Sequence, residues 1–545
     1  MITFATDRVL MSHCLGWEKK DKKDITIWFK GYLHNSSISN IYEQAFNCLN
    51  DNDNDVDIVK LSNWVNELRG HFSFIIRSPS WIFATVDKVN TIPLFYFENN
   101  NNFFVGNRPS LIKDKERLNQ KIINNQSYLE ISMSGYTTGR DTIYPSLFQL
   151  TAGECLLFHN NVLSRNFYYT YSPWKVNNRS EDKLIRDFNN VLHSTMTELI
   201  RSTKGRKIVI PLSAGNDSRL VASGLKHFGV KDVLCISYGR KNSFESIMAK
   251  EIAHKLGYKW KHVLISDKNK RKFFHSKKFQ KYKNNYDSYS SIPAVQDIAE
   301  ICLLKENNII PDDSIIVNGN SGDFISGGHI SSSLMNDLKP EVAWELFMQK
   351  HYSLWSKLYT STNKKNIIKQ LLEVAKSRDI PLSGHNHGFF ETFEYLGRQS
   401  MYVVNQQQAY DFNGYEWRLP LWSDSFINFW EGVPMKYKVE QNLYNKVLQE
   451  NNWGGVWRGM PINKKNIRPK WIAPLRLISK IFLSPFGKPI WHKFEKNVFQ
   501  YWMDVTRNSV IVPYHKVLLD SNGQKNTFSW VSKMYLEEKQ NINLE

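Results

Sequence analysis

Residues 213–218, Ser-Ala-Gly-Asn-Asp-Ser, are the segment of this sequence best suited to chemistry. A short β-branched run at residues 208–212 precedes them and predicts a buried strand, and an apolar helical pattern follows. A small-residue turn between a strand and a helix N-terminus binds anions, because free N–H groups and the helix dipole face it. Gly215 permits close backbone approach, and the two serine hydroxyls add donors. An ordinary strand-to-helix turn is the alternative interpretation.

A second glycine-rich loop, residues 318–329 (NGNSGDFISGGH), follows an expected strand at residues 315–317. It contains one carboxylate, Asp323, and the first loop contains another, Asp217. In an open α/β sheet, ligands bind beyond the carboxyl ends of the strands, so the two loops are expected to converge there. Carboxylates beside phosphates suit a magnesium ion, and we expect Asp217 and Asp323 to share one Mg²⁺. A glycine-rich turn without a ligand is the alternative.

Three regions are expected to position these loops: a β-rich region over residues 1–173, an α/β region over 181–465 and a helical extension over 466–545. In the second region, strands and helices alternate from residue 206 onward, which predicts a Rossmann-like parallel sheet with crossover helices. The fold class is therefore α/β, with an N-terminal α+β sandwich-like domain. In the first region, the sequence predicts helices near 39–49 and 57–69 and strands at 25–31, 72–76, 81–86, 94–97, 103–105 and 155–158.

Composition narrows the function classes. The 545 residues are 41% hydrophobic and 23% charged, as in ordinary globular proteins, and the net charge is +19. The charge suits an anionic substrate or surface, whereas no nucleic-acid-binding motif and no His/Cys metal cluster occur, so no nucleic-acid partner is expected. Five scattered cysteines, no signal peptide and no membrane-spanning run predict a cytoplasmic protein.

Residues 471–493 mix aromatic, aliphatic and basic side chains. A membrane-surface helix is one interpretation, and it would suit peripheral contact with a membrane and a lipid-linked sugar substrate. Because Pro474 and Pro485 interrupt the segment, a buried hinge is the other interpretation.

The first loop resembles the pyrophosphate loop, Ser-Gly-Gly-x-Asp-Ser, of the PP-loop ATP pyrophosphatases, with Ala214 at the first glycine. Both loops, in this order and spacing, resemble the synthetase domain of the asparagine synthetase family. The second loop matches that family at Gly319, Asp323, Gly327 and Gly328. Residues 414–424 resemble a further family segment, mainly structural, through Glu416, Arg418, Pro420 and Asp424.

The resemblance implies an ATP- and Mg²⁺-dependent enzyme that adenylates a carboxylate, releases pyrophosphate and AMP, and forms an amide. It implies that Lys464 or Lys465 neutralises the departing pyrophosphate, and that Asp217 and Asp323 serve catalysis through the metal. Backbone groups at the end of an expected strand over 233–238 could meet an adenine edge. The candidate nucleotide-binding residues are Ser213, Ala214, Gly215, Asn216, Asp217, Ser218, Ser237, Tyr238, Gly319 and Gly322.

The sequence departs from the family in its nitrogen chemistry. Residues 70–76, 86–96, 104–107, 135–139 and 149–153 resemble a class II glutamine amidotransferase domain, whose nucleophile is an N-terminal cysteine, but position 2 here is Ile2. We therefore expect a degenerate domain and nitrogen from free ammonia, another protein or another amine. Asn320 stands where the family carries a carboxylate base, and Phe324 replaces the next glutamate. Asp297 and Glu300 are candidate replacement bases, or members of a solvated helix face.

The predicted function is an ATP-dependent amide-forming ligase acting on a carboxylate-bearing small molecule or sugar. The second loop resembles those of members from bacterial surface-polysaccharide gene clusters, which implies a uronic acid as the substrate. Asparagine synthesis, disfavoured by Asn320, and peptide macrolactam formation are alternatives within the same chemistry. A catalytically silent nucleotide-binding or scaffold relative is the alternative of another class.

Overall fold

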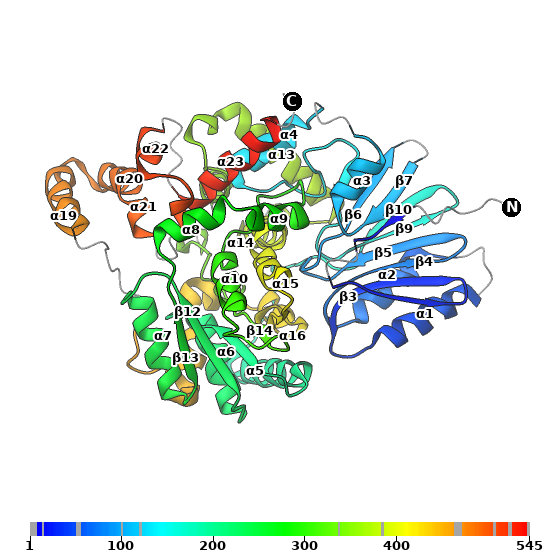
Figure 1. The fold of residues 1–545 in the computed structure, drawn as a ribbon, viewed down its shortest axis with the longest axis horizontal. Helices are drawn as coiled ribbons and strands as arrows, with labels where there is room; N and C mark the ends of the chain where they lie inside the picture. Colours follow the sequence, from blue (N-terminus) through cyan, green and yellow to red (C-terminus); the bar gives the residue numbers. More distant parts are fainter. Residues whose placement is uncertain are drawn as a thin grey trace.

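A computed structural model describes residues 8–12, 16–50, 56–99, 102–118, 122–335, 338–382, 386–462, 471–504, 508–520 and 526–541. The described chain has a β-sandwich on one side, a parallel sheet with helices beside it, and a helical C-terminal part (Figure 1). This confirms the α/β fold class. The predicted boundaries at residues 173, 181 and 465 stay predictions.

The β-sandwich consists of a six-stranded sheet, in the order β10-β9-β5-β4-β3-β2, and a four-stranded sheet, in the order β1-β7-β6-β8. Its strands are β1 (Val9–Leu10), β2 (Glu18–Lys22), β3 (Ile25–Leu33), β4 (Gly70–Arg77), β5 (Trp81–Val86), β6 (Phe95–Asn99), β7 (Asn102–Gly106), β8 (Leu147–Gln149), β9 (Glu154–His159) and β10 (Val162–Phe167). All six predicted strands are confirmed. The short β1, β2 and β8 and the exposed β10 were not predicted, because none of them carries a sustained apolar run.

Apolar side chains fill the space between the two sheets. Ile75 and Ile82 point from the six-stranded sheet toward Tyr96 and Val105 of the four-stranded one, and all four are completely buried. The opposite face of the six-stranded sheet packs against α1 (Ile38–Asn50) and α2 (Ile58–Glu67), which the sequence predicted. Two further helices, α3 (Pro109–Lys115) and α4 (Asn125–Ser134), were not predicted.

The parallel sheet has the order β13-β12-β11-β14-β15, and every neighbouring pair is parallel. Its strands are β11 (Ile208–Pro211), β12 (Val233–Tyr238), β13 (Lys259–Val263), β14 (Ile315–Val317) and β15 (Glu416–Arg418). Helices α6 (Asn216–His227) and α7 (Phe244–Lys255) are the crossovers between the first three strands. Because β11 lies between β12 and β14, the carboxyl ends of these three strands are neighbours, as the sequence predicted.

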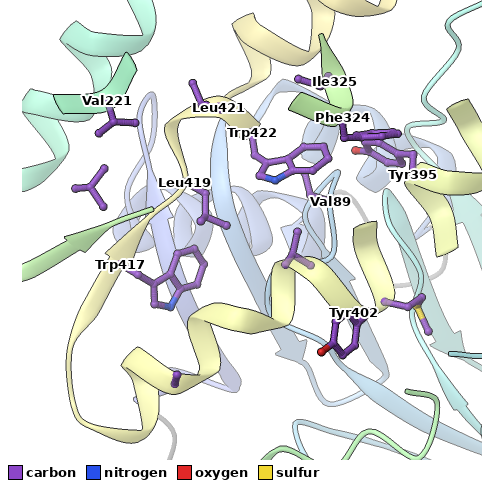
Figure 2. Packing of buried hydrophobic residues seen from close by; sticks show 14 of the residues in the cluster. Val89, Val221, Phe324, Ile325, Tyr395, Tyr402, Trp417, Leu419, Leu421 and Trp422 are labelled. Carbon is purple, nitrogen blue, oxygen red and sulfur yellow. The ribbon is translucent and has the colours of Figure 1, made fainter. Parts of the chain in front are cut away.

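The described residues of this part form twelve further α-helices. They are α5 (Glu181–Thr203), α8 (Asp267–Phe274), α9 (Lys277–Tyr286), α10 (Ile298–Glu306), α11 (Gly322–Ile325), α12 (Pro340–His351), α13 (Ser361–Ser377), α14 (Asn386–Glu394), α15 (Gln408–Phe412), α16 (Asp424–Glu431), α17 (Met435–Lys438) and α18 (Asn442–Asn451). The core beneath the second loop is aromatic: Phe324 of α11 packs toward Trp422, with ring centroids 6.0 Å apart, and Tyr395 lies on the same indole at 5.6 Å (Figure 2).

The C-terminal part is helical, as predicted. It comprises α19 (Ile472–Leu483), α20 (Lys488–Val498), α21 (Gln500–Met503), α22 (Tyr514–Leu519) and α23 (Thr527–Asn541). The last helix returns to the body, where the Ser532 hydroxyl donates to the Ile131 carbonyl of α4 at 2.9 Å. Helix α19 stands at the outer edge of the molecule, on the side opposite the β-sandwich (Figure 1). No described helix has the length and apolar character needed to cross a membrane.

Candidate functional site

The first loop connects β11 to α6 and is held in shape by its own hydroxyls. The Ser213 N–H donates to Ser218 Oγ at 3.0 Å, and the hydroxyls of these two serines lie 3.0 Å apart. The Gly215 N–H donates to Ser213 Oγ at 3.1 Å. No side chain caps the N-terminus of α6, so its first N–H groups face the loop without a capping acceptor. This geometry is suited to an anion.

The second loop lies directly against the first. A Cβ atom on Gly319 would come within 2.7 Å of the backbone carbon of Asp217, and one on Gly322 would come within 2.7 Å of Asp217 Oδ1. Only glycine allows this approach. The Asp323 N–H donates to Asp217 Oδ2 at 2.9 Å. The structure thus brings together the two carboxylates that the sequence selected from separate strands.

Charged side chains of both signs gather around the two aspartates. Burial and the nearby charge of Asp323 raise the pKa of Asp217 well above its ordinary value. His329 lies with Nε2 3.2 Å from Asp323 Oδ2, and its Nδ1 contacts Glu394. Burial acts to lower the pKa of His329, but its hydrogen bonds to Asp323 and Glu394 outweigh burial and raise that pKa to about 9. The role of His329 was not predicted, because the sequence shows that it follows Asp323 by six residues but not that its side chain contacts Asp323.

A divalent cation fits this pair of carboxylates. Asp217 is held against a like charge in a partly buried position, which a cation would relieve. Among the described residues, no group of three or more His, Cys, Asp or Glu side chains is arranged to hold a metal ion by itself. Magnesium typically takes one or two carboxylates and completes its shell with phosphate oxygens and water, so two aspartates are sufficient.

Arg219 is a site residue that the sequence did not indicate. It is completely buried in α6, and its guanidinium donates to the Ala214 carbonyl of the first loop at 2.6 Å. The same group donates to the Val456, Met460 and Pro461 carbonyls, each at 3.2 Å. It therefore ties the loop to the chain that leads toward Lys464 and Lys465. Both lysines lie outside the described residues.

A buried polar network joins the ends of β12 and β14. The Tyr238 hydroxyl contacts Asp297, and the Tyr410 hydroxyl donates to the other Asp297 oxygen at 2.9 Å. Asn318 Nδ2 donates to the Tyr410 hydroxyl at 2.8 Å. The Ser237 side chain also has a protein partner, since its hydroxyl donates to the Leu212 carbonyl at 2.7 Å. The side chains of Ser237 and Tyr238 are therefore engaged with protein partners and position the strand ends.

The solvated-face interpretation of Asp297 and Glu300 is wrong. Both residues are 2% exposed. Glu300 forms an ion pair with Lys270 at 2.5 Å, and burial raises the pKa of Asp297 to about 6. The reason is that α10 packs against α8 and α15, so the carboxylates of Asp297 and Glu300 face protein partners and not water.

The two departures of the second loop have structural explanations. Asn320 Nδ2 donates to Gln406 Oε1 at 2.7 Å, and its N–H donates to Asn318 Oδ1 at 3.0 Å, so its amide is fixed by other amides. Phe324 is 1% exposed and packs in the aromatic core (Figure 2). Neither the Asn320 amide nor the Phe324 ring can act as a base.

Residues 414–424 link the parallel sheet to the β-sandwich. Glu416 begins β15 and pairs with Arg206, while Asp424 accepts from Lys88 Nζ at 2.7 Å and from the Gly70 N–H at 3.1 Å. A cavity of about 830 Å³ lies beside this segment, lined by Lys30, Arg418 and others. It opens at the amino ends of the parallel strands, away from the two loops, so we place the candidate site at the loops.

This architecture defines an α/β protein with two glycine-rich loops at adjacent strand ends, and the comparisons with known proteins complement it. No known protein-family model matches the chain. Over 221 residues it is 24% identical to a protein of Methanocaldococcus jannaschii named "Putative asparagine synthetase (glutamine-hydrolyzing) 2". That match covers 39% of this chain and 42% of the relative, so the chain spans less than half of the relative's length. The chain is thus similar, at a low level, to an asparagine synthetase.

Two solved structures also match in part. One is described as the allosteric regulatory enzyme of purine biosynthesis, with 10% identity and a TM-score of 0.18 over 44% of this chain and 61% of that one. The other is a glutamine phosphoribosylpyrophosphate amidotransferase of B. subtilis complexed with ADP and GMP, with 9% identity and a TM-score of 0.18 over 46% and 73%. TM-scores this low establish no common fold.

Proposed function

We propose that this protein is an ATP-dependent ligase that activates a substrate carboxylate as an acyl-adenylate and converts it to an amide. The observation that carries the proposal is the contact between the two loops through Asp217 and Asp323. This contact brings the uncapped N-terminus of α6, two hydroxyl groups and two carboxylates to one place, which supports the binding of a phosphate group and a divalent cation there. The low-level similarity to an asparagine synthetase supports the same chemistry.

In the proposed reaction, a carboxylate oxygen attacks the α-phosphorus of ATP and the bond to pyrophosphate breaks. An amine nitrogen then attacks the acyl carbon, AMP leaves, and the amine gives up a proton to a base. The α6 N–H groups with Ser213 and Ser218 would hold the phosphates, while Lys464 or Lys465 would neutralise the leaving pyrophosphate. Backbone groups at Ser237 and Tyr238 would meet the adenine. Mg²⁺, held by Asp217 and Asp323, would offset charge on the phosphates.

We propose a uronic acid of a surface polysaccharide as the carboxylate. The net charge of +19 favours an anionic substrate. Asparagine synthesis is disfavoured because Asn320, at the place of the family's base, is bound to Gln406 and cannot take a proton. Ammonia, delivered free or by another protein, is the proposed nitrogen source.

A screen of carboxylates for AMP formation tests the proposal. Purified protein is incubated with Mg²⁺, ATP and ammonium, and AMP is measured with uronic acids, aspartate or no carboxylate; the series is repeated with glutamine. We expect AMP to form only with a carboxylate, and best with a uronic acid. Nucleotide binding without AMP formation for any carboxylate would favour the silent relative. Equal rates of AMP formation with glutamine and with ammonium would contradict the prediction that the amidotransferase-like domain does not hydrolyse glutamine.

A further inference from the structure

Helix α19 presents an apolar face to the solvent. Five of its residues and one that follows it are large, apolar and between 51% and 71% exposed: Leu475, Leu477, Ile478, Ile481, Phe482 and Phe486. We call these six residues the outer face of α19. A contiguous exposed apolar surface of this kind marks an interaction site. The buried-hinge interpretation of this segment is therefore wrong for α19.

The outer face follows from the helical periodicity and from the packing of the opposite side. At about 100° per residue, the five outer residues within α19 occupy an arc of about 160° that contains no charged side chain. Ile472, on the other side, is 1% exposed and packs with Trp491 of α20 and with Phe499. Arg476 is also on that side, and its Nε donates to Glu495 at 2.7 Å. These contacts fix the rotation of α19 and direct its apolar arc outward.

Basic residues accompany this apolar face. Between residues 471 and 499 the sequence has five lysines and arginines and only one carboxylate, Glu495, which is already paired with Arg476. Lys480 is exposed on the side of the helix that borders the outer face. An amphipathic helix with bulky apolar residues on one side and basic residues on the other is suited to the interface of an anionic bilayer.

We infer that α19 docks this protein on an anionic lipid surface, with the outer face in the headgroup region and the helix parallel to the membrane. Its position at the edge of the molecule leaves the approach open (Figure 1). Charge argues against a second copy as the occupant, because two outer faces meeting about a two-fold axis would bring two net-positive segments together. An anionic surface attracts the same charges. The inference does not depend on the proposed function.

Flotation of the full chain with vesicles tests this inference. The probes are phosphatidylcholine vesicles with and without phosphatidylglycerol. We expect binding to the anionic vesicles to be at least about tenfold stronger, and to weaken at high salt, because each basic residue near the surface adds attraction. A double variant, Ile481→Asn with Phe482→Asn, should lose about tenfold or more of this binding. A matched control, Val162→Asn in β10, removes a side chain that is 62% exposed in the β-sandwich and should bind like the wild type.

Three results would overturn the inference. The first is equal binding of the double variant and the wild type. The second is equal binding to neutral and anionic vesicles. The third is a lipid-free dimer in sedimentation velocity that the double variant abolishes, since a second copy would then cover the face. Because Ile481 and Phe482 are 63% and 71% exposed, their replacement should leave the melting temperature unchanged. A second pair, Leu477→Asn with Ile478→Asn, should give the same loss of binding.

Discussion

The backbone N–H of Asp323 donates to Oδ2 of Asp217 at 2.9 Å, and this bond joins loops that are more than a hundred residues apart in the chain. The acceptor is a carboxylate whose pKa is raised by burial and by the charge of Asp323 itself. Two like charges are thus held together by a backbone donor, and they would be relieved by a shared cation. The arrangement has a stability consequence and a binding consequence that can be separated.

Asp217→Asn should separate them. The amide oxygen can still accept from the Asp323 N–H, whereas one of the two charges is gone. We expect unfolding free energy to be unchanged or slightly higher, and carboxylate-dependent AMP formation to fall by about a hundredfold or more, a loss typical of a removed electrostatic group. Urea unfolding and an AMP assay measure the two effects. Asp312→Asn, on the surface, is the control. Full activity in Asp217→Asn would contradict the proposed cation site.

Arg219→Lys should weaken the structure around the first loop. The guanidinium of Arg219 donates to four carbonyls. The lysine side chain is shorter and carries a single nitrogen, so its ammonium group cannot reach all four. With buried carbonyls left unpaired, we expect a loss of about 3 kcal/mol in unfolding free energy. Proteolysis near residues 456–462 should become faster, and added ATP should slow it. Arg201→Lys, an exposed position in α5, is the control. An unchanged proteolysis pattern would show that Arg219 does not hold this segment.

The loops could be predicted from sequence because their signals are local. Residues 208–218 contain the strand, the turn and the start of the helix in one short segment. The second loop is also local, because its glycines directly follow β14 in the sequence. Arg219 could not be predicted, because its partners at 456, 460 and 461 are contributed by a distant segment. The partner of Glu300, Lys270, comes from another helix for the same reason. The outer face of α19 could be predicted only in part. The helical periodicity of its apolar residues is visible in the local sequence, but which side of the helix is buried depends on packing against α20.

Asp297 should make stability depend on pH. Burial raises its pKa from 3.8 to about 6 in the folded state, so the folded protein binds a proton more tightly than the unfolded chain does. Stability from this group is full below about pH 4 and declines as pH rises through 6, by about 3 kcal/mol in total. Asp297→Asn keeps an acceptor oxygen for one of the two tyrosines and removes the titration. The stability of the variant relative to the wild type should therefore rise between pH 4 and pH 7. A difference that stays constant over this range would contradict the assignment.

The buried ion pair of Lys270 and Glu300 tests whether Glu300 is a structural residue or a base. Both side chains are 3% exposed and their charged atoms lie 2.5 Å apart. Glu300→Gln leaves the lysine charge in a buried position, and we expect a loss of about 3–5 kcal/mol in unfolding free energy. The double variant Lys270→Met, Glu300→Leu removes both charges and should recover most of that stability, because it also removes the desolvation penalty.

Activity in the double variant then decides the role of Glu300. If the pair is structural, the refolded double variant should form AMP and amide at rates within a few-fold of the wild type. If Glu300 accepts the proton of the incoming amine, amide formation should stay low although stability is restored, while AMP release from the activated carboxylate continues by hydrolysis. Measuring AMP and amide in the same reaction distinguishes these outcomes. We expect the structural one, because Glu300 is 2% exposed and its Oε1 accepts from Lys270 Nζ at 2.5 Å.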